Sequence, residues 1–365
     1  MVGEEFLFNT DEKPFLFNGS ARKALDETLP ELMDESEERD FKIPIFTSFS
    51  LVQDTLGVRS RHGKEWPLIG AILPSETFSG SFIRTEEHQL QVGRKRADLT
   101  PLDRGKLEDS ILEIRERIRN GEALQVVISH RFNLEGFNGP EILRHLLFND
   151  KSRYVYYYKM GNLEILGSTP ENAFTKHGDH LTINPIAGTR NRVGNTDASL
   201  VATLLSDNKE LCEHRMLVDL ARNDLSRIGS PDSVNVSRSM VPEKFYSVIH
   251  LTSSVEAKLA KGKSNFDIFS SLIPAGTVSG APKFRAIEII DEYETTERGP
   301  YGGTVGVMGK DHMDMALTIR SAFKNGGKSY TQAGAGIVKD SDPSNEIDEI
   351  IAKAGTILAG GLICA

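Results

Sequence analysis

Three charged residues near the C-terminus have a spacing that could bring them to one chemical site. Glu346, Glu349 and Lys353 follow one another at intervals of three and four residues, so a helix over residues 345–359 projects all three from one face. Charged residues at this spacing usually form a solvated, salt-bridged surface. With a carboxylate from another element, for which Glu213 is the candidate, they could instead form a hard-oxygen site of the kind that binds Mg²⁺.

A histidine and a threonine provide a second candidate site. His250 stands among apolar neighbours, where most histidines are packed core residues, but an imidazole can also act as a general acid or base near neutral pH. Thr277 follows Pro274-Ala-Gly276 in a glycine-rich stretch. This stretch lacks the Gly-x-x-x-x-Gly-Lys-[Ser/Thr] spacing of a phosphate loop, which argues against nucleotide binding.

Motifs in the second half of the chain are similar to those of one enzyme family. The chain resembles the chorismate-utilising enzymes, most closely the synthase component of anthranilate synthase, densely from about Gln125 to Lys353 and weakly before that. The motifs that carry the resemblance are Pro185–Arg190, Glu213–Asp219, Pro274–Pro282, Gln332–Gly336 and Glu346–Glu349.

The resemblance implies a role for each matching residue. Glu213 and Glu349 would ligate Mg²⁺ and Glu346 would support the ion, which in turn would bind the ring carboxylate of chorismate. His250 would be the catalytic acid or base near the departing 4-hydroxyl, and Thr277 would orient it. The implied substrate-binding residues are Gly188, Thr189, Tyr301, Arg320, Gly334, Gly336 and Lys353, of which Arg320 and Tyr301 would hold the enolpyruvyl carboxylate.

Two positions separate the reactions within the family. Aminodeoxychorismate synthases carry a nucleophilic Lys where this chain has Ala187, and isochorismate and salicylate synthases carry a Lys that activates water where it has Gln125. Ala187 offers no amine, and Gln125 can hydrogen-bond an amine but cannot deprotonate water. The resemblance therefore implies an anthranilate synthase, which converts chorismate and ammonia to anthranilate and pyruvate in the first committed step of tryptophan biosynthesis.

Other functions stay open as alternatives. Aminodeoxychorismate synthase and isochorismate synthase are opposed by Ala187 and Gln125 respectively. A non-catalytic chorismate-binding relative is expected to have lost part of the catalytic set, yet the residues of that set are all present: Glu213, His250, Glu346, Glu349 and Lys353.

The source of ammonia and the regulation depend on other parts of the sequence. Neither Cys212 nor Cys364 lies in a glycine-flanked nucleophile turn, so we expect a separate glutamine amidotransferase subunit. Of the family's tryptophan-sensing segment Asn-Pro-Ser-Pro-Tyr-Met, only Ser152 and Tyr154 remain, and the first 60 residues contain no clear Leu-Leu-Glu-Ser. Inhibition by tryptophan is therefore expected to be absent, weaker or built from other residues.

The bulk composition agrees with a cytoplasmic enzyme. Apolar residues make up 39% and charged residues 26% of the 365 residues, as in soluble globular proteins. The net charge of −9 and the lack of a basic tract argue against nucleic acid. No signal peptide or membrane-spanning apolar run is present, and two cysteines are too few for a disulfide framework.

Periodicity predicts the elements that must position these residues. Helices are predicted over 101–120, over 197–222 as one long helix, and from a first turn holding Pro282 to about Glu292. Strands are predicted over 124–132 and 314–320, with a hairpin formed by 154–158 and 163–166.

The uneven alternation of these elements favours an α+β fold. The resemblance implies two large antiparallel β-sheets that pack together and are flanked by helices, with the active site in the cleft between the lobes. We expect a divergent, shortened N-terminal part over residues 1–95 and a catalytic region over 96–365, interwoven into one unit.

Overall fold

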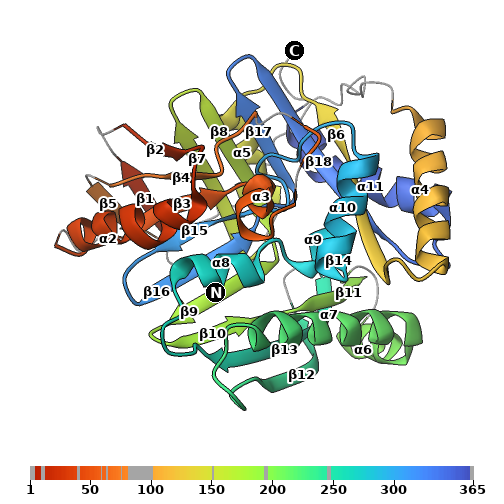
Figure 1. The fold of residues 1–365 in the computed structure, drawn as a ribbon. Coiled ribbons are helices and arrows are strands. Elements are labelled where there is room, and N and C mark those ends of the chain that lie inside the picture. The colour runs from red at the N-terminus through yellow and green to blue at the C-terminus, as the bar shows by residue number, and fades with distance from the viewer. Residues whose placement is uncertain are drawn as a thin grey trace.

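Antiparallel β-sheets form the framework of the protein (Figure 1). The computed structural model describes residues 5–9, 13–38, 42–58, 60–62, 65–74, 76–80, 102–149, 152–192, 196–244 and 248–361. The predicted fold class is confirmed, because two large antiparallel sheets pack together with helices around them. The predicted boundary at residues 95–96 lies outside the described residues.

The larger sheet has ten strands and the smaller has six, and a separate pair lies near the N-terminus. The larger sheet contains β2 (Phe15–Phe17), β3 (Ile43–Thr47), β4 (Ile69–Ala71), β9 (Asn172–His177), β10 (His180–Ile183), β11 (Ile186–Asn191), β12 (Asn235–Lys244), β13 (Val248–Lys258), β15 (Thr304–Met308) and β16 (His312–Leu317). The smaller contains β6 (Gln125–Asn133), β7 (Tyr154–Met160), β8 (Leu163–Thr169), β14 (Gly280–Ala281), β17 (Ser321–Asn325) and β18 (Lys328–Ile337). The separate pair is β1 (Glu5–Asn9) with β5 (Glu76–Gly80).

Helices pack against both sheets (Figure 1). The smaller sheet is contacted by α4 (Arg104–Arg119), α5 (Gly139–Asn149), α9 (Gly276–Ser279), α10 (Lys283–Tyr293) and α11 (Pro343–Gly361). The larger sheet is contacted by α2 (Leu29–Glu38), α6 (Asp197–Ser206) and α7 (Asn208–Ser226). The remaining helical segments are α1 (Ala21–Lys23), η1 (Ala24–Thr28), η2 (Phe49–Leu51), α3 (Val52–Thr55) and α8 (Asn265–Leu272). None of the described helices is long and apolar enough to cross a membrane.

Tyrosines of β7 connect the two sheets. Tyr154 donates a hydrogen bond to Asp314 of β16 over 2.8 Å, and Tyr158 donates to the Gly306 carbonyl of β15 over 2.7 Å. Alternate residues of a strand share a face, so these side chains point the same way, towards the larger sheet. Tyr154, one of the two residues left from the tryptophan-sensing motif, is thus a half-buried bridge between the sheets.

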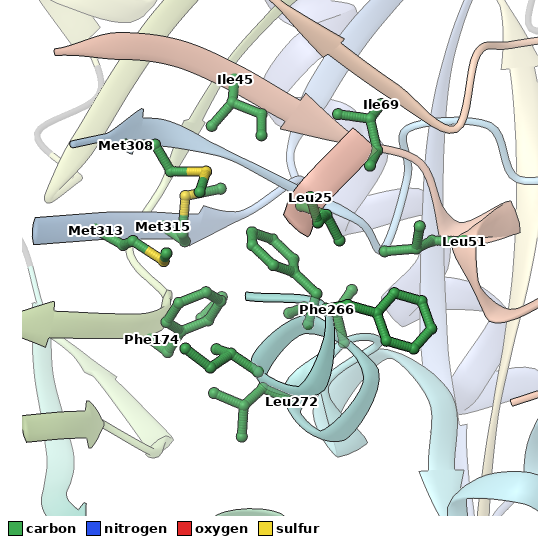
Figure 2. Close-up of a cluster of buried hydrophobic side chains, with 14 of the residues drawn as sticks. Leu25, Ile45, Leu51, Ile69, Phe174, Phe266, Leu272, Met308, Met313 and Met315 are labelled. Carbon is green, nitrogen blue, oxygen red and sulfur yellow. The ribbon is translucent and has the colours of Figure 1, made fainter. Parts of the chain in front are cut away.

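The largest hydrophobic cluster lies between the ten-stranded sheet and helices. Figure 2 shows Met308, Met313 and Met315 of β15 and β16 on one side of this cluster, and Phe266 and Leu272 of α8 on another. All of these side chains are less than a tenth exposed. Burial of large apolar side chains contributes about 1.5–3 kcal/mol each, so this cluster holds the helices on the sheet that forms one wall of the cavity described below.

The predicted elements are found, with corrections at their ends. The predicted helix over 197–222 is wrong, because it is two helices that meet at Asp207. The Asp207 side chain accepts hydrogen bonds from the backbone N–H groups of Lys209 and Glu210 and so caps the start of α7. Pro282 is the residue before the first turn of α10. The strand predicted over 314–320 is β16, which ends at Leu317.

A close approach of backbones joins the N-terminal strands to the rest of the larger sheet. Thr304 of β15 pairs with Thr47 of β3, and a Cβ atom added to the preceding Gly303 would overlap the Thr47 carbonyl oxygen. We expect Gly303→Ala to lower the free energy of unfolding in urea by about 1–3 kcal/mol or more. Gly327→Ala is the control, because its Cβ would meet no atom within 4 Å. Equal stability of the two variants would contradict this packing.

Candidate active site

A cavity of about 930 Å³ gathers nearly all of the residues singled out in the sequence. Its walls come from both large sheets and from helices α7, α9 and α11. The predicted residues that line it are Gln125, Ala187, Gly188, Glu213, His250, Thr277, Tyr301, Arg320, Gly334, Gly336, Glu346, Glu349 and Lys353. Thr189 lies opposite His250 in the pairing of β11 with β13, and its side chain lies outside the described part of the structure.

A bulge in β11 orients His250. The register between β11 and β13 shifts at Gly188, whose φ of +62° is strained for any residue with a side chain. The Gly188 carbonyl lies 2.9 Å from Nδ1 of His250. A carbonyl oxygen can only accept, so Nδ1 carries a hydrogen and Nε2 holds the lone pair of the neutral ring. Burial lowers the pKa of His250, and the nearby charge of Arg320 lowers it further, so the neutral ring is favoured.

Two glycines of β18 allow this strand to lie close to side chains of other elements in the cavity wall. A Cβ atom at Gly334 would lie 2.8 Å from the Tyr301 hydroxyl, and one at Gly336 would overlap the side-chain nitrogen of Gln125. The Gln125 amide oxygen has no hydrogen-bond partner among the described residues. An unpartnered acceptor in a cavity wall is suited to a ligand that donates hydrogen bonds.

Cationic groups lie at the same wall. Lys353 donates to the Gly334 carbonyl over 3.0 Å and pairs with Glu349 at 2.6 Å. Arg320 follows β16 with a φ of +48°, an uncommon backbone conformation for a residue with a side chain. Such strain costs about 1–3 kcal/mol and is found mostly where function requires it. The arrangement provides positive charge for anionic groups of a ligand.

The three candidate metal ligands come from two helices. Glu213 lies on α7, and Glu346 and Glu349 lie on α11, with all three in the cavity wall. Burial raises the pKa of Glu213, and the charges of Glu210 and Glu349 raise it further. Burial and Glu349 likewise raise the pKa of Glu346. Carboxylates that repel one another in this way are a fitting donor set for Mg²⁺.

The metal site is not preassembled. Among the described residues, no group of three or more His, Cys, Asp or Glu side chains is already placed around one point. Glu349 is engaged by Lys353 at 2.6 Å, and Lys209 lies 3.7 Å from Glu213. Binding of a cation would therefore require these lysines to release the carboxylates.

The structure adds Glu171, which the sequence analysis passed over. This residue lies between β8 and β9 in the cavity wall. Burial raises its pKa, and Thr277, Lys353 and Arg320 offset part of that rise. A raised pKa makes a carboxyl group a more available proton donor than an ordinary Glu. The available signal was a Glu two residues after the fully buried strand Leu163–Thr169, a position where a charge is expected to face a cavity or a partner.

The cysteines have no place in this chemistry. Cys212 is an exposed free thiol of α7 at the edge of the cavity, and Cys364 lies beyond the described residues.

Comparison with known proteins decides the family. Residues 75–359 match the model of the chorismate binding enzymes. The chain belongs to this family. Anthranilate synthase component 1 of Neisseria meningitidis serogroup A is 42% identical over 287 residues, which are 76% of this chain and 58% of that protein. The corresponding protein of Lactococcus lactis is 39% identical over 77% of this chain and 62% of its own length. The chain thus spans less than two thirds of the length of these curated relatives.

Solved structures agree with the family assignment. Anthranilate synthase component I from Streptococcus pneumoniae has a TM-score of 0.81 and 30% identity, covering 97% of this chain and 92% of its own. MenF, the menaquinone-specific isochorismate synthase of Escherichia coli, has a TM-score of 0.76 at 20% identity, covering 98% of this chain and 86% of its own. The second likeness concerns the fold alone.

The raised pKa of Glu171 predicts a pH-dependent cost to stability. A folded-state pKa above the usual value of 4.5 means that the folded chain binds this proton more tightly than the unfolded chain, so stability falls as pH rises through that window. We expect Glu171→Gln to be more stable than the parent in urea at about pH 8, with the advantage shrinking towards about pH 4.5. The exposed Glu31→Gln is the control. An advantage that is constant with pH would contradict the prediction.

Proposed function

We propose that the chain is the synthase component of an anthranilate synthase, which converts chorismate and ammonia to anthranilate and pyruvate. The observation that carries the proposal is that Ala187 and Gln125 line the same cavity as His250 and Arg320. At Ala187 this cavity has a methyl group where a covalent reaction would need an amine, so the nucleophile must be small and external. Two relatives described above, from Neisseria meningitidis and Streptococcus pneumoniae, are anthranilate synthase components, which supports the same reaction.

Binding of chorismate would use the positive groups of the cavity. Arg320 and the Tyr301 hydroxyl would hold the enolpyruvyl carboxylate, and the close backbone at Gly334 and Gly336 would let the substrate approach the strand. Lys353 would lie near the ring carboxylate. Glu213 and Glu349, supported by Glu346, would hold Mg²⁺, which when bound supplies positive charge that binds and neutralises the ring carboxylate.

Ammonia is the nucleophile that suits Gln125. Water must lose a proton to attack, whereas ammonia attacks through its own lone pair and can donate its hydrogens to an acceptor. The unpartnered Gln125 oxygen would accept one of them and so aim the lone pair at ring carbon 2. The 4-hydroxyl would leave as water with a proton from Glu171, whose pKa is raised by burial, and the ammonium group formed at ring carbon 2 would lose one proton to the solvent.

The second half of the reaction needs a base. Removal of the proton from ring carbon 2 would expel the enolpyruvyl group as pyruvate and leave the aromatic ring of anthranilate. Both His250 and Glu213 are candidates for this base. The lowered pKa of His250 keeps its ring neutral, with the lone pair on Nε2, and this favours it as the proton acceptor.

Ammonia would be delivered by a glutamine amidotransferase subunit in a heteromeric, cytoplasmic complex. This partner is inferred from the proposed reaction, which consumes ammonia. Free ammonium at alkaline pH would replace it in solution.

Product analysis tests the reaction directly. The purified chain with chorismate, Mg²⁺ and ammonium at about pH 8.5 is expected to form equal amounts of anthranilate and pyruvate, because the share of unprotonated ammonia, the nucleophilic form, increases as the pH rises towards the pKa of ammonium. Fluorescence and chromatography measure the products. Formation of isochorismate or aminodeoxychorismate in place of anthranilate would overturn the proposal.

Replacement of Ala187 tests the branch between reactions. Ala187→Lys introduces an amine into the cavity wall and is expected to suppress anthranilate formation by at least tenfold. Ala187→Met is the control of similar length without the amine. Mass spectrometry of the protein after incubation with chorismate would detect a covalent adduct on the Lys variant alone. Undiminished anthranilate formation by the Lys variant would contradict the role proposed for Ala187.

A further inference from the structure

The guanidinium of Arg298 is buried behind the cavity and binds two segments of its wall, α9 and β6. Arg298, in the turn that follows α10, is 3% exposed and pairs with both carboxylate oxygens of Glu294, at 2.6 and 2.9 Å. Two further hydrogens go to backbone carbonyls, those of Val278 at 2.6 Å and Val127 at 2.7 Å. Its carbon Cζ lies 4.5 Å from the ring centre of Phe49. Each of the three guanidinium nitrogens therefore has a hydrogen-bond acceptor.

The two carbonyls belong to segments that carry proposed reaction residues. Val278 follows Thr277 in the short helix α9, and Val127 is two residues after Gln125 on β6, so its side chain shares the face of Gln125. Both valines line the cavity. Only a planar group with hydrogens along two edges can span these carbonyls and a carboxylate together, and Lys cannot reproduce this geometry.

The ion pair of Arg298 with Glu294 is also connected to strand β18, through Ser129 of β6. Glu294 accepts from the Ser129 backbone N–H at 2.8 Å and lies 2.6 Å from the Ser129 hydroxyl. A carboxylate paired with Arg only accepts, so the hydroxyl must donate to it. Its oxygen is then left to accept from the Gln332 side-chain NH₂ at 2.8 Å.

This chain of donors fixes the orientation of the Gln332 amide. With its NH₂ turned to Ser129, Gln332 keeps its oxygen on the other side, and that oxygen has no hydrogen-bond partner among the described residues. Gln332 is 2% exposed and lines the cavity. The family resemblance assigned roles only to the two glycines of the Gln332–Gly336 motif.

We infer that Arg298 is a positioning residue, which acts through Glu294 to hold the Thr277 turn, the Gln125 strand and the Gln332 amide in one arrangement. The inference deepens the proposed function and rests on it. A buried ion pair is by itself weak evidence for stability, because apolar residues of similar volume often stabilise a fold as well. The guanidinium of Arg298 donates to carbonyls of the cavity wall. The role that best explains this ion pair is therefore to hold those wall segments in place.

Arg298→Lys tests this role. Lys keeps the charge but cannot bind both carbonyls, so kcat for anthranilate formation is expected to fall about ten- to a hundredfold, with a smaller change in the KM for chorismate. Arg131→Lys is the matched control. Arg131 donates to the Glu297 carbonyl in the same turn and to Glu65 at 3.0 Å, and it does not line the cavity. Its replacement is expected to lower stability and to leave kcat within twofold.

Two outcomes would overturn the role of Arg298. One is a kcat within twofold of the parent for Arg298→Lys, and the other is an equal loss for Arg131→Lys, which would indicate stability alone. Ser129→Ala covers the case in which Arg298→Lys does not fold, because it leaves the guanidinium in place and frees the Gln332 amide. This variant is expected to lose kcat with no larger a drop in melting temperature than Arg131→Lys, and full activity would remove Gln332 from the proposal.

Hydrogen exchange separates this inference from the proposed function. Amides of Gly276–Ser279 are expected to exchange at least tenfold faster in Arg298→Lys than in Arg131→Lys, whatever reaction the protein catalyses. Unchanged exchange in this segment would overturn the positioning role. If the parent protein makes no anthranilate, the proposed reaction fails, and the exchange rates still decide whether Arg298 holds the α9 turn.

Discussion

The ion pair of Arg298 with Glu294 is the contact at which the walls of the cavity meet the helix behind them. It links the end of α10 to α9 and β6, and through Ser129 to β18. A charge removed from water needs a partner for each of its hydrogen-bonding groups, or its burial costs several kcal/mol. Here each guanidinium nitrogen and each carboxylate oxygen has a partner from backbone or side chain, so the ion pair can lie in the interior and connect segments that are distant in the sequence.

The carboxyl groups that face the cavity differ from this ion pair in how fully they are partnered. Glu171, Glu213 and Glu346 all have a raised pKa because burial removes water without supplying a full set of partners. Such groups lower the stability of the empty protein and are ready to receive a cation or to give up a proton. Arg298 and Glu294 behind the wall are well partnered, whereas Glu171, Glu213 and Glu346 in the cavity are less so. This difference indicates that ligands bind in the cavity.

The fold alone does not determine which reaction of chorismate is catalysed. Proteins named as anthranilate and isochorismate synthases share this arrangement of two sheets, so the choice must come from side chains in the cavity. Under the proposed function, the choice in this chain depends on small differences, a methyl group at Ala187 and a neutral amide at Gln125. Neither group can form a covalent bond with the substrate or remove a proton from water, which is why the proposed nucleophile is ammonia.

The sequence by itself determined the local elements and the membership of the cavity. Helical spacing placed Glu346, Glu349 and Lys353 on one face, and two strand-like runs on either side of Gly161-Asn162 predicted the β7–β8 hairpin, because both signals lie within a few residues. Tertiary structure decided what depends on distant partners. The capping of α7 by Asp207 divided a predicted single helix, and burial raised the pKa of Glu171, which no motif had marked. The contacts of Arg298 and Gln332 join residues up to 203 positions apart, and such pairing leaves no periodic signal because it exists only once the sheets have packed.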